Sequence, residues 1–297
     1  MRKTKNRNVI SEINENKLFQ LQIHFKIILE EGFKIIDENK SEFNIYHSLF
    51  KRYIYGFESL NILLKDFDSE KRYREQSISI ILRASLLDYL TTLYLGTFQA
   101  EMKFNSELKV KYDAEIDKLT SEQIRRIISI SENDKKTLFY NHKVLCQTVD
   151  LFKESFSHLF DPNIPIDYNK PGKSLRYKSH DDIKSTTIRK RLDDVSDQLQ
   201  NIRYEDVFYL YDVYSKYDHF GTASMLLEYM DINTVITNFL GATFHIAEGV
   251  GFCIDLMIDE TNCNSNFDKI NHEISSLRGT VYSKAFWLSP EYKSKNQ

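Results

Sequence analysis

Two charged residues stand alone in a long apolar stretch, and their types could serve phosphate chemistry. In "ISIILRASLLDYLTTLYL", residues 78–95, only Arg83 and Asp88 carry a charge. Arginine is well suited to holding a phosphate group. The two residues are five positions apart, about 140° around a helix, so they cannot easily pair with each other. We therefore expect each of them to find a partner on another helix, and both are candidates for a catalytic site.

A histidine near "YDVYSKYDHFG", residues 211–221, is the third catalytic candidate. Tyr211, Ser215 and His219 recur every four residues, so they share one face of a helix that Gly221 is expected to end. In one reading, His219 only finishes the helix, near the negative end of its dipole. In the other, it reaches a polar pocket around Arg83 and acts as a general acid or base.

The polar pocket has two further candidate members in "FHIAEG". His245 and Glu248 are three residues apart and can touch on one helix face. We assign them to the pocket together with Tyr211 and Ser215. The di-iron motif Glu-x-x-His has the opposite order and occurs on two helices, so we predict no metal site. We also predict no cofactor, because "NKPGKSLRY" lacks the first glycine of a phosphate-binding loop.

The basic charge of the chain is concentrated in residues 170–191. Eight lysines and arginines against Asp181 and Asp182 give this segment a net charge of +6, so the rest of the chain carries −9. Such a block can attract nucleic acid or a nucleotide, or it can simply form a solvated loop and helix face. The candidate anion-binding residues are Lys173, Arg176, Lys178, Arg189 and Arg191.

The elements that must position these residues are expected to be helices. Nine glycines and four prolines are few for 297 residues, which favours long helices over folds with many tight turns. Apolar spacing predicts helices over 9–38, 42–66, 70–99, 106–130, 133–160, 181–199, 203–217, 223–258 and 265–284. A break is expected at 66–69 and one long loop at 161–179, which holds three of the prolines. The fold class is therefore an all-α multi-helix bundle.

The chain is expected to form one helical domain over residues 1–297. Residues 1–66 would be an N-terminal layer and residues 285–297 a mobile tail. Three widely spaced cysteines without a CxxC pair indicate neither a zinc cluster nor a disulfide framework, which favours a cytoplasmic location. The most apolar window, 235–258, is interrupted by His245, Glu248 and Asp255, so we predict a buried helix and no membrane span. A homo-oligomer is left open.

Two stretches carry a resemblance to known proteins. "ILRASLLDYL" resembles the arginine-to-acid helix of a family of all-helical bacterial proteins of unknown function. "SLRYKSHDDI" followed by "YDVYSKYDHFG" resembles that family's basic loop and Tyr-x-x-x-Ser-x-x-x-His signature, and the resemblance covers residues 40–260. The family is similar in architecture to the HEPN group of helical domains, several of which are RNA-cleaving toxins or nucleotide-binding modules.

This chain departs from the ribonuclease members of that group. They carry an arginine, four to six residues, and then a histidine, whereas the nearest match here, Arg176 and His180, has three residues between. Any active site would therefore combine Arg83 from one helix with His219 from another. Two functions stay open: a nucleotide- or RNA-directed protein, and a non-catalytic interaction or scaffold module whose buried polar groups fix the packing. Whether the chain is an enzyme is left undecided.

Overall fold

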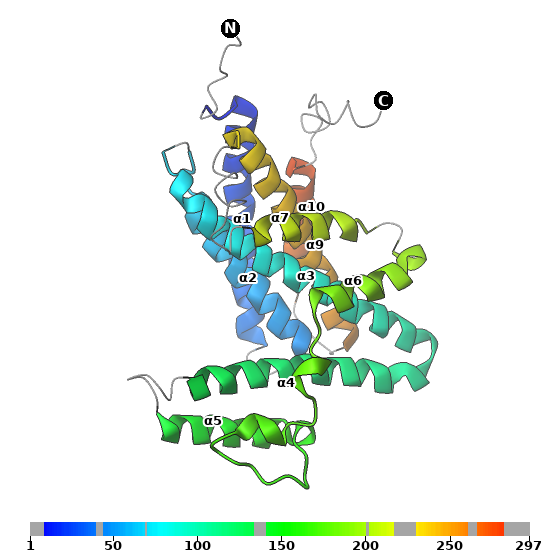
Figure 1. Cartoon of the computed structure of the whole chain (residues 1–297). Helices are drawn as coiled ribbons and strands as arrows, with labels where there is room; N and C mark the ends of the chain where they lie inside the picture. Colours follow the sequence, from blue (N-terminus) through cyan, green and yellow to red (C-terminus); the bar gives the residue numbers. More distant parts are fainter. Residues whose placement is uncertain are drawn as a thin grey trace. The chain divides into compact units, whose positions relative to one another are not determined.

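The helices of a computed structural model confirm the all-α prediction (Figure 1). The structure describes residues 9–39, 44–68, 70–133, 141–199, 202–216, 230–260 and 266–281. Within these ranges there are nine α-helices and no strand. They are α1 (Glu12–Glu38), α2 (Ile45–Leu64), α3 (Glu75–Phe104), α4 (Lys109–Asn133), α5 (His142–Ser155), α6 (Ser185–Asp194), α7 (Tyr204–Ser215), α9 (Ile232–Glu260) and α10 (Asp268–Val281).

The chain divides into two compact units. Unit 1 consists of residues 1–94 and 194–297, and unit 2 of residues 95–193. Helix α3 runs across the division, so a continuous element belongs to both units. The division does not test the prediction of a single domain, because units that share a helix can still fold together. The expected mobile tail, 285–297, lies outside the described residues.

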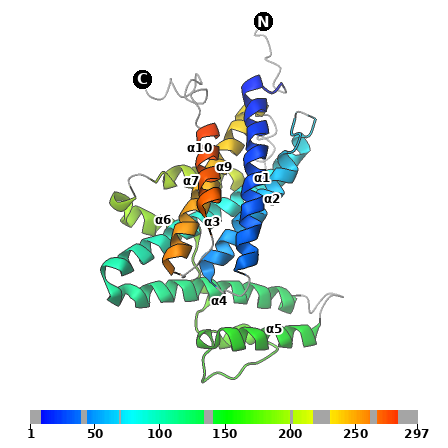
Figure 2. The same cartoon turned by 180° about the vertical axis from the view of Figure 1, so that it is seen from behind.

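In unit 1, the first helices pack against the last ones. Helix α1 contacts α2 and α10, and α9 contacts α2, α10 and α7. Figure 2 shows α1, α9 and α10 from behind. Phe25 of α1 and Phe57 of α2 bring their ring centroids within 5.1 Å, and both side chains are fully buried. Segments from opposite ends of the sequence therefore share one core.

Helices α3 and α9 are the most apolar elements. By length and composition alone, the helical stretches Arg72–Phe104 and Ile232–Glu260 could cross a membrane, yet most of each apolar window is buried inside the protein. Residues of α3 such as Ile78, Leu82, Leu86 and Leu90 have no exposed surface, whereas Ile80 on the same helix is 46% exposed. The absence of a membrane span stays a prediction.

At two glycines of unit 1, the helix backbone lies very close to side chains of neighbouring helices. A Cβ atom on Gly249 of α9 would lie 2.8 Å from Tyr53 Oη and 2.9 Å from Tyr89 Cδ2. On Gly56 of α2, it would lie 2.8 Å from Ser85 Oγ of α3. Any larger residue at these positions must push a neighbour away. The two glycines therefore set how closely α9 and α3 can approach α2.

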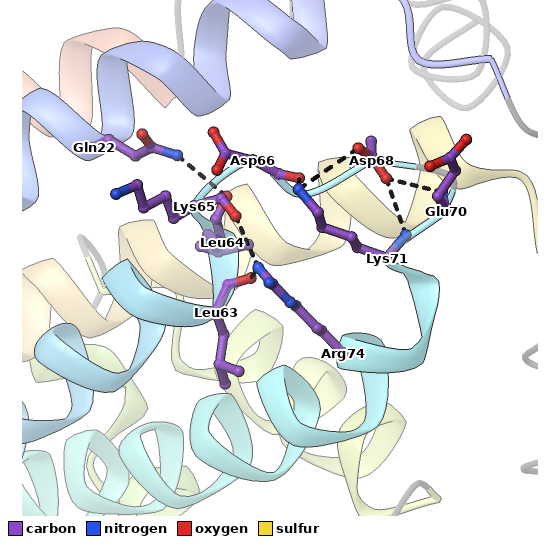
Figure 3. Close-up of polar contacts among 9 residues, drawn as sticks. All are labelled: Gln22, Leu63, Leu64, Lys65, Asp66, Asp68, Glu70, Lys71 and Arg74. Atoms are coloured by element: carbon purple, nitrogen blue, oxygen red, sulfur yellow. Dashed lines mark hydrogen bonds and ion pairs between the residues drawn. The ribbon is translucent and has the colours of Figure 1, made fainter.

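The end of α2 is held by side chains from other elements (Figure 3). The last carbonyls of a helix have no partner within it. Arg74 donates to the carbonyl oxygens of Leu63 (3.1 Å) and Lys65 (2.8 Å). Gln22 of α1 donates to the carbonyl oxygen of Leu64 at 3.1 Å. The 3-10 turn before α3 and the middle of α1 therefore both fix the point where α2 stops.

The turn after α2 confirms the break expected at 66–69. Asp66 takes a left-handed backbone conformation with φ 54°, which a helix cannot continue. Lys71 Nζ donates to the Asp66 carbonyl oxygen at 2.8 Å. Asp68 Oδ1 accepts from the backbone N–H groups of Glu70 and Lys71 at 2.8 and 2.9 Å, and these bonds close the turn (Figure 3).

The close contact at Gly249 gives a first prediction. Gly249→Ala places a methyl group against Tyr53 and Tyr89, so we expect a loss of about 1–3 kcal/mol in the free energy of unfolding. The matched control is Gly251→Ala on the same helix, where an added Cβ meets nothing within 4 Å. That change should stabilise by about 0.5–1 kcal/mol, because alanine is the better helix former. Urea unfolding measures both, and equal effects would refute the close-packing argument.

Candidate functional site

Asp88 is paired with a residue that the sequence analysis did not single out. Arg52 of α2 donates from Nε to both carboxylate oxygens, at 3.1 and 3.0 Å, and its Nη2 lies 2.9 Å from Oδ1. The Asp88 side chain is buried, while more than half of the Arg52 side chain is exposed. The expected partner on another helix is confirmed for Asp88. The only feature of the sequence that pointed to Arg52 was its charge within the largely apolar stretch of α2.

Hydrogen bonds link the backbone of Asp88 to Thr92 and, through Thr92, to Tyr53. Burial raises the pKa of its carboxyl group, and Arg52 only partly offsets this effect. Thr92 donates to the Asp88 carbonyl oxygen at 2.8 Å, and the Tyr53 hydroxyl lies 2.9 Å from the Thr92 hydroxyl. Burial also raises the pKa of Tyr53 well above its usual value, so its phenol stays neutral. This network joins α2 to α3, and its contacts are those of a packing element.

Arg83 has a different neighbour on a different helix. Its guanidinium lies over the ring of Tyr211 on α7, 5.4 Å from the centroid. The Ser215 hydroxyl donates to the carbonyl oxygen of Asp212 in its own helix at 2.7 Å. The structure therefore brings Arg83 to Tyr211, and Asp88 contacts Arg52 instead of Arg83. His219 lies outside the described residues.

The expected contact between His245 and Glu248 is confirmed, and a third residue joins it. His245 Nδ1 lies 3.0 Å from Glu248 Oε2 on α9, and Arg278 Nη2 of α10 lies 3.2 Å from Glu248 Oε1. Burial and the Glu248 carboxylate together raise the pKa of Tyr89 from α3. Arg278 was missed because its partner lies on another helix. Among the described residues, no group of three or more His, Cys, Asp and Glu could hold a metal ion.

A second polar contact between helices, missed by the sequence analysis, joins α1 to α10. His24 Nδ1 lies 2.6 Å from Glu273 Oε1, and its Nε2 lies 2.8 Å from Thr280 Oγ1. About two turns earlier on α1, Lys17 Nζ donates to the carbonyl oxygen of Val281 at 3.1 Å. His24 and Lys17 are both buried, and their place among the apolar residues of α1 was the available signal. Their contacts also hold helices together.

The long loop of unit 2 is packed onto its helices. An apolar cluster joins α4, α5 and both ends of the loop. Its members are Ile124, Ile128, Leu145, Val149, Leu159, Phe160 and Leu175. Phe160 and Leu175 form an isolated antiparallel bridge. Beside it, the backbone N–H of Arg176 donates to the carbonyl oxygen of Leu159 at 2.9 Å. The ends of the loop are therefore fixed side by side.

Further contacts fix the loop along its length. Arg125 of α4 donates from Nη2 to the carbonyl oxygen of Tyr177 at 2.8 Å and forms an ion pair with Asp182. The Tyr168 hydroxyl donates to Asp150 Oδ1 of α5 at 2.5 Å. Side-chain and backbone contacts thus hold the loop against both α4 and α5.

The predicted anion-binding residues fall into two groups. The side chains of Lys173, Arg176, Lys178 and Arg189 are exposed. Arg191 is instead engaged within unit 2. Its Nη2 lies 2.7 Å from Glu101 Oε1, its Nε donates to Thr97 Oγ1 at 3.0 Å, and its guanidinium lies 4.3 Å from the Phe98 ring centroid. We call residues 170–191 the basic segment. Its other exposed cations are Lys170, Lys184 and Lys190.

Comparison of the chain with family models, with curated proteins and with solved structures finds no match. The resemblance to an all-helical bacterial family and to HEPN domains therefore stays a prediction.

The Arg52–Asp88 pair gives a pH-dependent prediction. Arg52→Ala removes the cation that offsets burial, so the pKa of Asp88 should rise further. When a carboxyl group has a higher pKa in the folded state than in the unfolded state, it destabilises the fold at any pH above its pKa in the unfolded chain. Because Arg52 is half exposed, we expect about 2 kcal/mol at about pH 7.5, below the value for a fully buried pair. The loss should be smaller at about pH 5, where the folded state can keep its proton.

Denaturant unfolding at both pH values measures this effect. The control is Asp88→Asn in the Arg52→Ala background, which should abolish the added pH dependence because no carboxyl remains. An equal loss of stability in Arg52→Ala at both pH values would contradict the pairing.

The contacts of Arg125 give a prediction for the loop. Arg125→Ala removes the bond to Tyr177 and the ion pair with Asp182, so limited proteolysis should cut residues 161–182 faster. Arg126→Ala is the matched control, because Arg126 is largely exposed and pairs with Glu122 on its own helix. Its cutting rate should stay near that of the wild type. If both variants are cut equally fast, Arg125 does not hold the loop.

Proposed function

We propose that this chain binds RNA through the basic segment of unit 2, as a binding module without catalysis by the buried polar groups. The proposal rests on one observation: the cations of the segment are mostly exposed while its acids are engaged. Asp182 pairs with Arg125, and Asp181 Oδ2 accepts from the backbone N–H of Lys178 at 2.9 Å. The segment has a net charge of +6 and most of its cations are exposed, which suits a phosphate backbone.

The packing of the loop supports this proposal. Exposed Lys173, Arg176 and Lys178 belong to a stretch that is tied to α4 and α5 by the bridge and by Arg125. Cations on a fixed backbone lose less conformational freedom on binding than cations on a free chain. Backbone recognition of this kind is largely independent of base sequence.

The contacts of unit 1 support a role without catalysis there. Asp88 is occupied by Arg52, and Glu248 is occupied by His245 and Arg278. A composite site of Arg83 and His219 stays a second proposal. It is favoured by the contact of Arg83 with Tyr211 of α7, because α7 ends at Ser215, four residues before His219 in the sequence. A cytoplasmic location and a possible homo-oligomer accompany the main proposal and are untested.

RNA titrations at several salt concentrations test the proposal. Binding should weaken steeply between about 50 and 200 mM salt, because each phosphate contact releases counterions. Replacing Lys173, Arg176, Lys178 and Arg189 together by Ala should flatten the plot of log K against log salt, by about 0.7 for each lost contact with a single strand.

The control replaces four exposed lysines of unit 1 by Ala, so that both variants lose four positive charges. These are Lys26, Lys34, Lys65 and Lys269. The control variant should keep the wild-type salt dependence. Absence of RNA binding at low salt, or equal flattening in both variants, would refute the assignment to the basic segment.

A further inference from the structure

Unit 2 contains two histidine–aspartate pairs, one within the basic segment and one outside it. His158 Nε2 is 3.0 Å from Asp117 Oδ1 of α4, and His180 Nε2 is 3.3 Å from Asp181 Oδ1. Both imidazoles are well exposed, with 58% and 73% of their side-chain surface accessible. Solvent and an approaching ligand can therefore reach both rings.

His158 is placed next to the cations by the pairing of the loop ends. The backbone N–H of Arg176 donates to the carbonyl oxygen of Leu159, the residue after His158, at 2.9 Å. Asp117, which pairs with His158, also lies near Tyr177. Residues 176 and 178, on either side of Tyr177, are exposed cations of the segment. His180 follows two residues later in the same stretch. Both histidines thus stand among the groups proposed to meet RNA.

The charged groups around each histidine can be named. His158 is faced by Asp117 of α4. Around Tyr177 lie Asp117, Arg176, and the ion pair of Lys118 with Glu115. Next to His180 are Asp181, Lys178, and the ion pair of Asp182 with Arg125. Burial raises the pKa of Tyr177, so this phenol stays neutral. Lysine, arginine and carboxyl groups ordinarily titrate outside the range in which histidine does.

The charge of each pair depends on its imidazole. With a neutral imidazole the pair carries a net charge of −1 and repels a polyanion, and with an imidazolium it carries none. Histidine ordinarily changes its charge between about pH 5 and 8. A phosphate backbone bound beside the pair favours the imidazolium, because nearby negative charge stabilises a cation. Binding of RNA and of protons would therefore assist each other.

We propose that His158 and His180 make the RNA affinity of unit 2 proton-dependent, so that binding is tighter in mildly acidic than in mildly alkaline solution. This inference rests on the proposed RNA binding and adds a regulation to the same site.

The experiment measures the Kd for one labelled RNA at constant ionic strength, at about pH 5.5, 6.5 and 8, across the range in which histidine titrates. In the wild type we expect Kd to fall by about tenfold from the highest to the lowest pH, since two unit charges are added near phosphates. The double variant His158→Gln/His180→Gln should lose most of the pH dependence. Each single variant should lose part of it.

The control is His272→Gln, an exposed histidine of α10 in unit 1, which should keep the full pH dependence. Thermal melts at each pH show whether all variants are folded. If the double variant is not folded, the two single variants are compared with the wild type instead. A wild-type Kd that does not change with pH, while binding stays salt-dependent, would overturn the inference and leave the proposed function intact. So would an unchanged pH dependence in the double variant. Absence of binding at every pH would remove both.

Discussion

The burial of the Asp88 carboxylate within the apolar stretch of α3 constrains the arrangement of unit 1. Most of the apolar stretch of α3 is buried inside the protein, so Asp88 must meet a cation where it is covered. Arg52 supplies that cation from α2. The Tyr53–Thr92 bond and the close approach of Gly56 to Ser85 match the same antiparallel register of α2 and α3. A slip of α2 by one residue would separate the ion pair.

The fold could be predicted from sequence wherever the signal is local. Scarcity of glycine and proline, helical spacing and the break near Asp66 predicted most helices of unit 1 to within about five residues. Helix α9 begins at Ile232, although a start at 223 was expected, and residues 223–229 lie outside the described ones. Helix α5 was expected to reach residue 160 but ends at Ser155. There the chain turns through a 3-10 helix so that Phe160 can pair with Leu175. This pairing depends on residues fifteen positions away, which a helical spacing does not report.

In the candidate site, too, contacts within one helix could be predicted from sequence, and contacts between helices could not. His245 and Glu248 lie three residues apart on one helix, so their contact followed from spacing alone. The partner of Asp88 lies 36 residues away, and that of His24 lies 249 residues away. Sequence showed that each buried polar group needed a partner, because an unpaired buried charge is costly. Which residue would meet that need depends on how the helices cross.

The pairing of α1 with α10 has a consequence for the order in which the chain can fold during synthesis. Lys17 contacts Val281, and His24 contacts Glu273, so α1 must wait for residues made more than 240 positions later. Until then, α2 can cover part of α1, but the side that packs on α10 is open to water, chaperones or other nascent chains. Unit 2 closes through contacts within residues 95–193 and can form while the ribosome is still translating α9. The middle of the chain would thus be folded before its beginning.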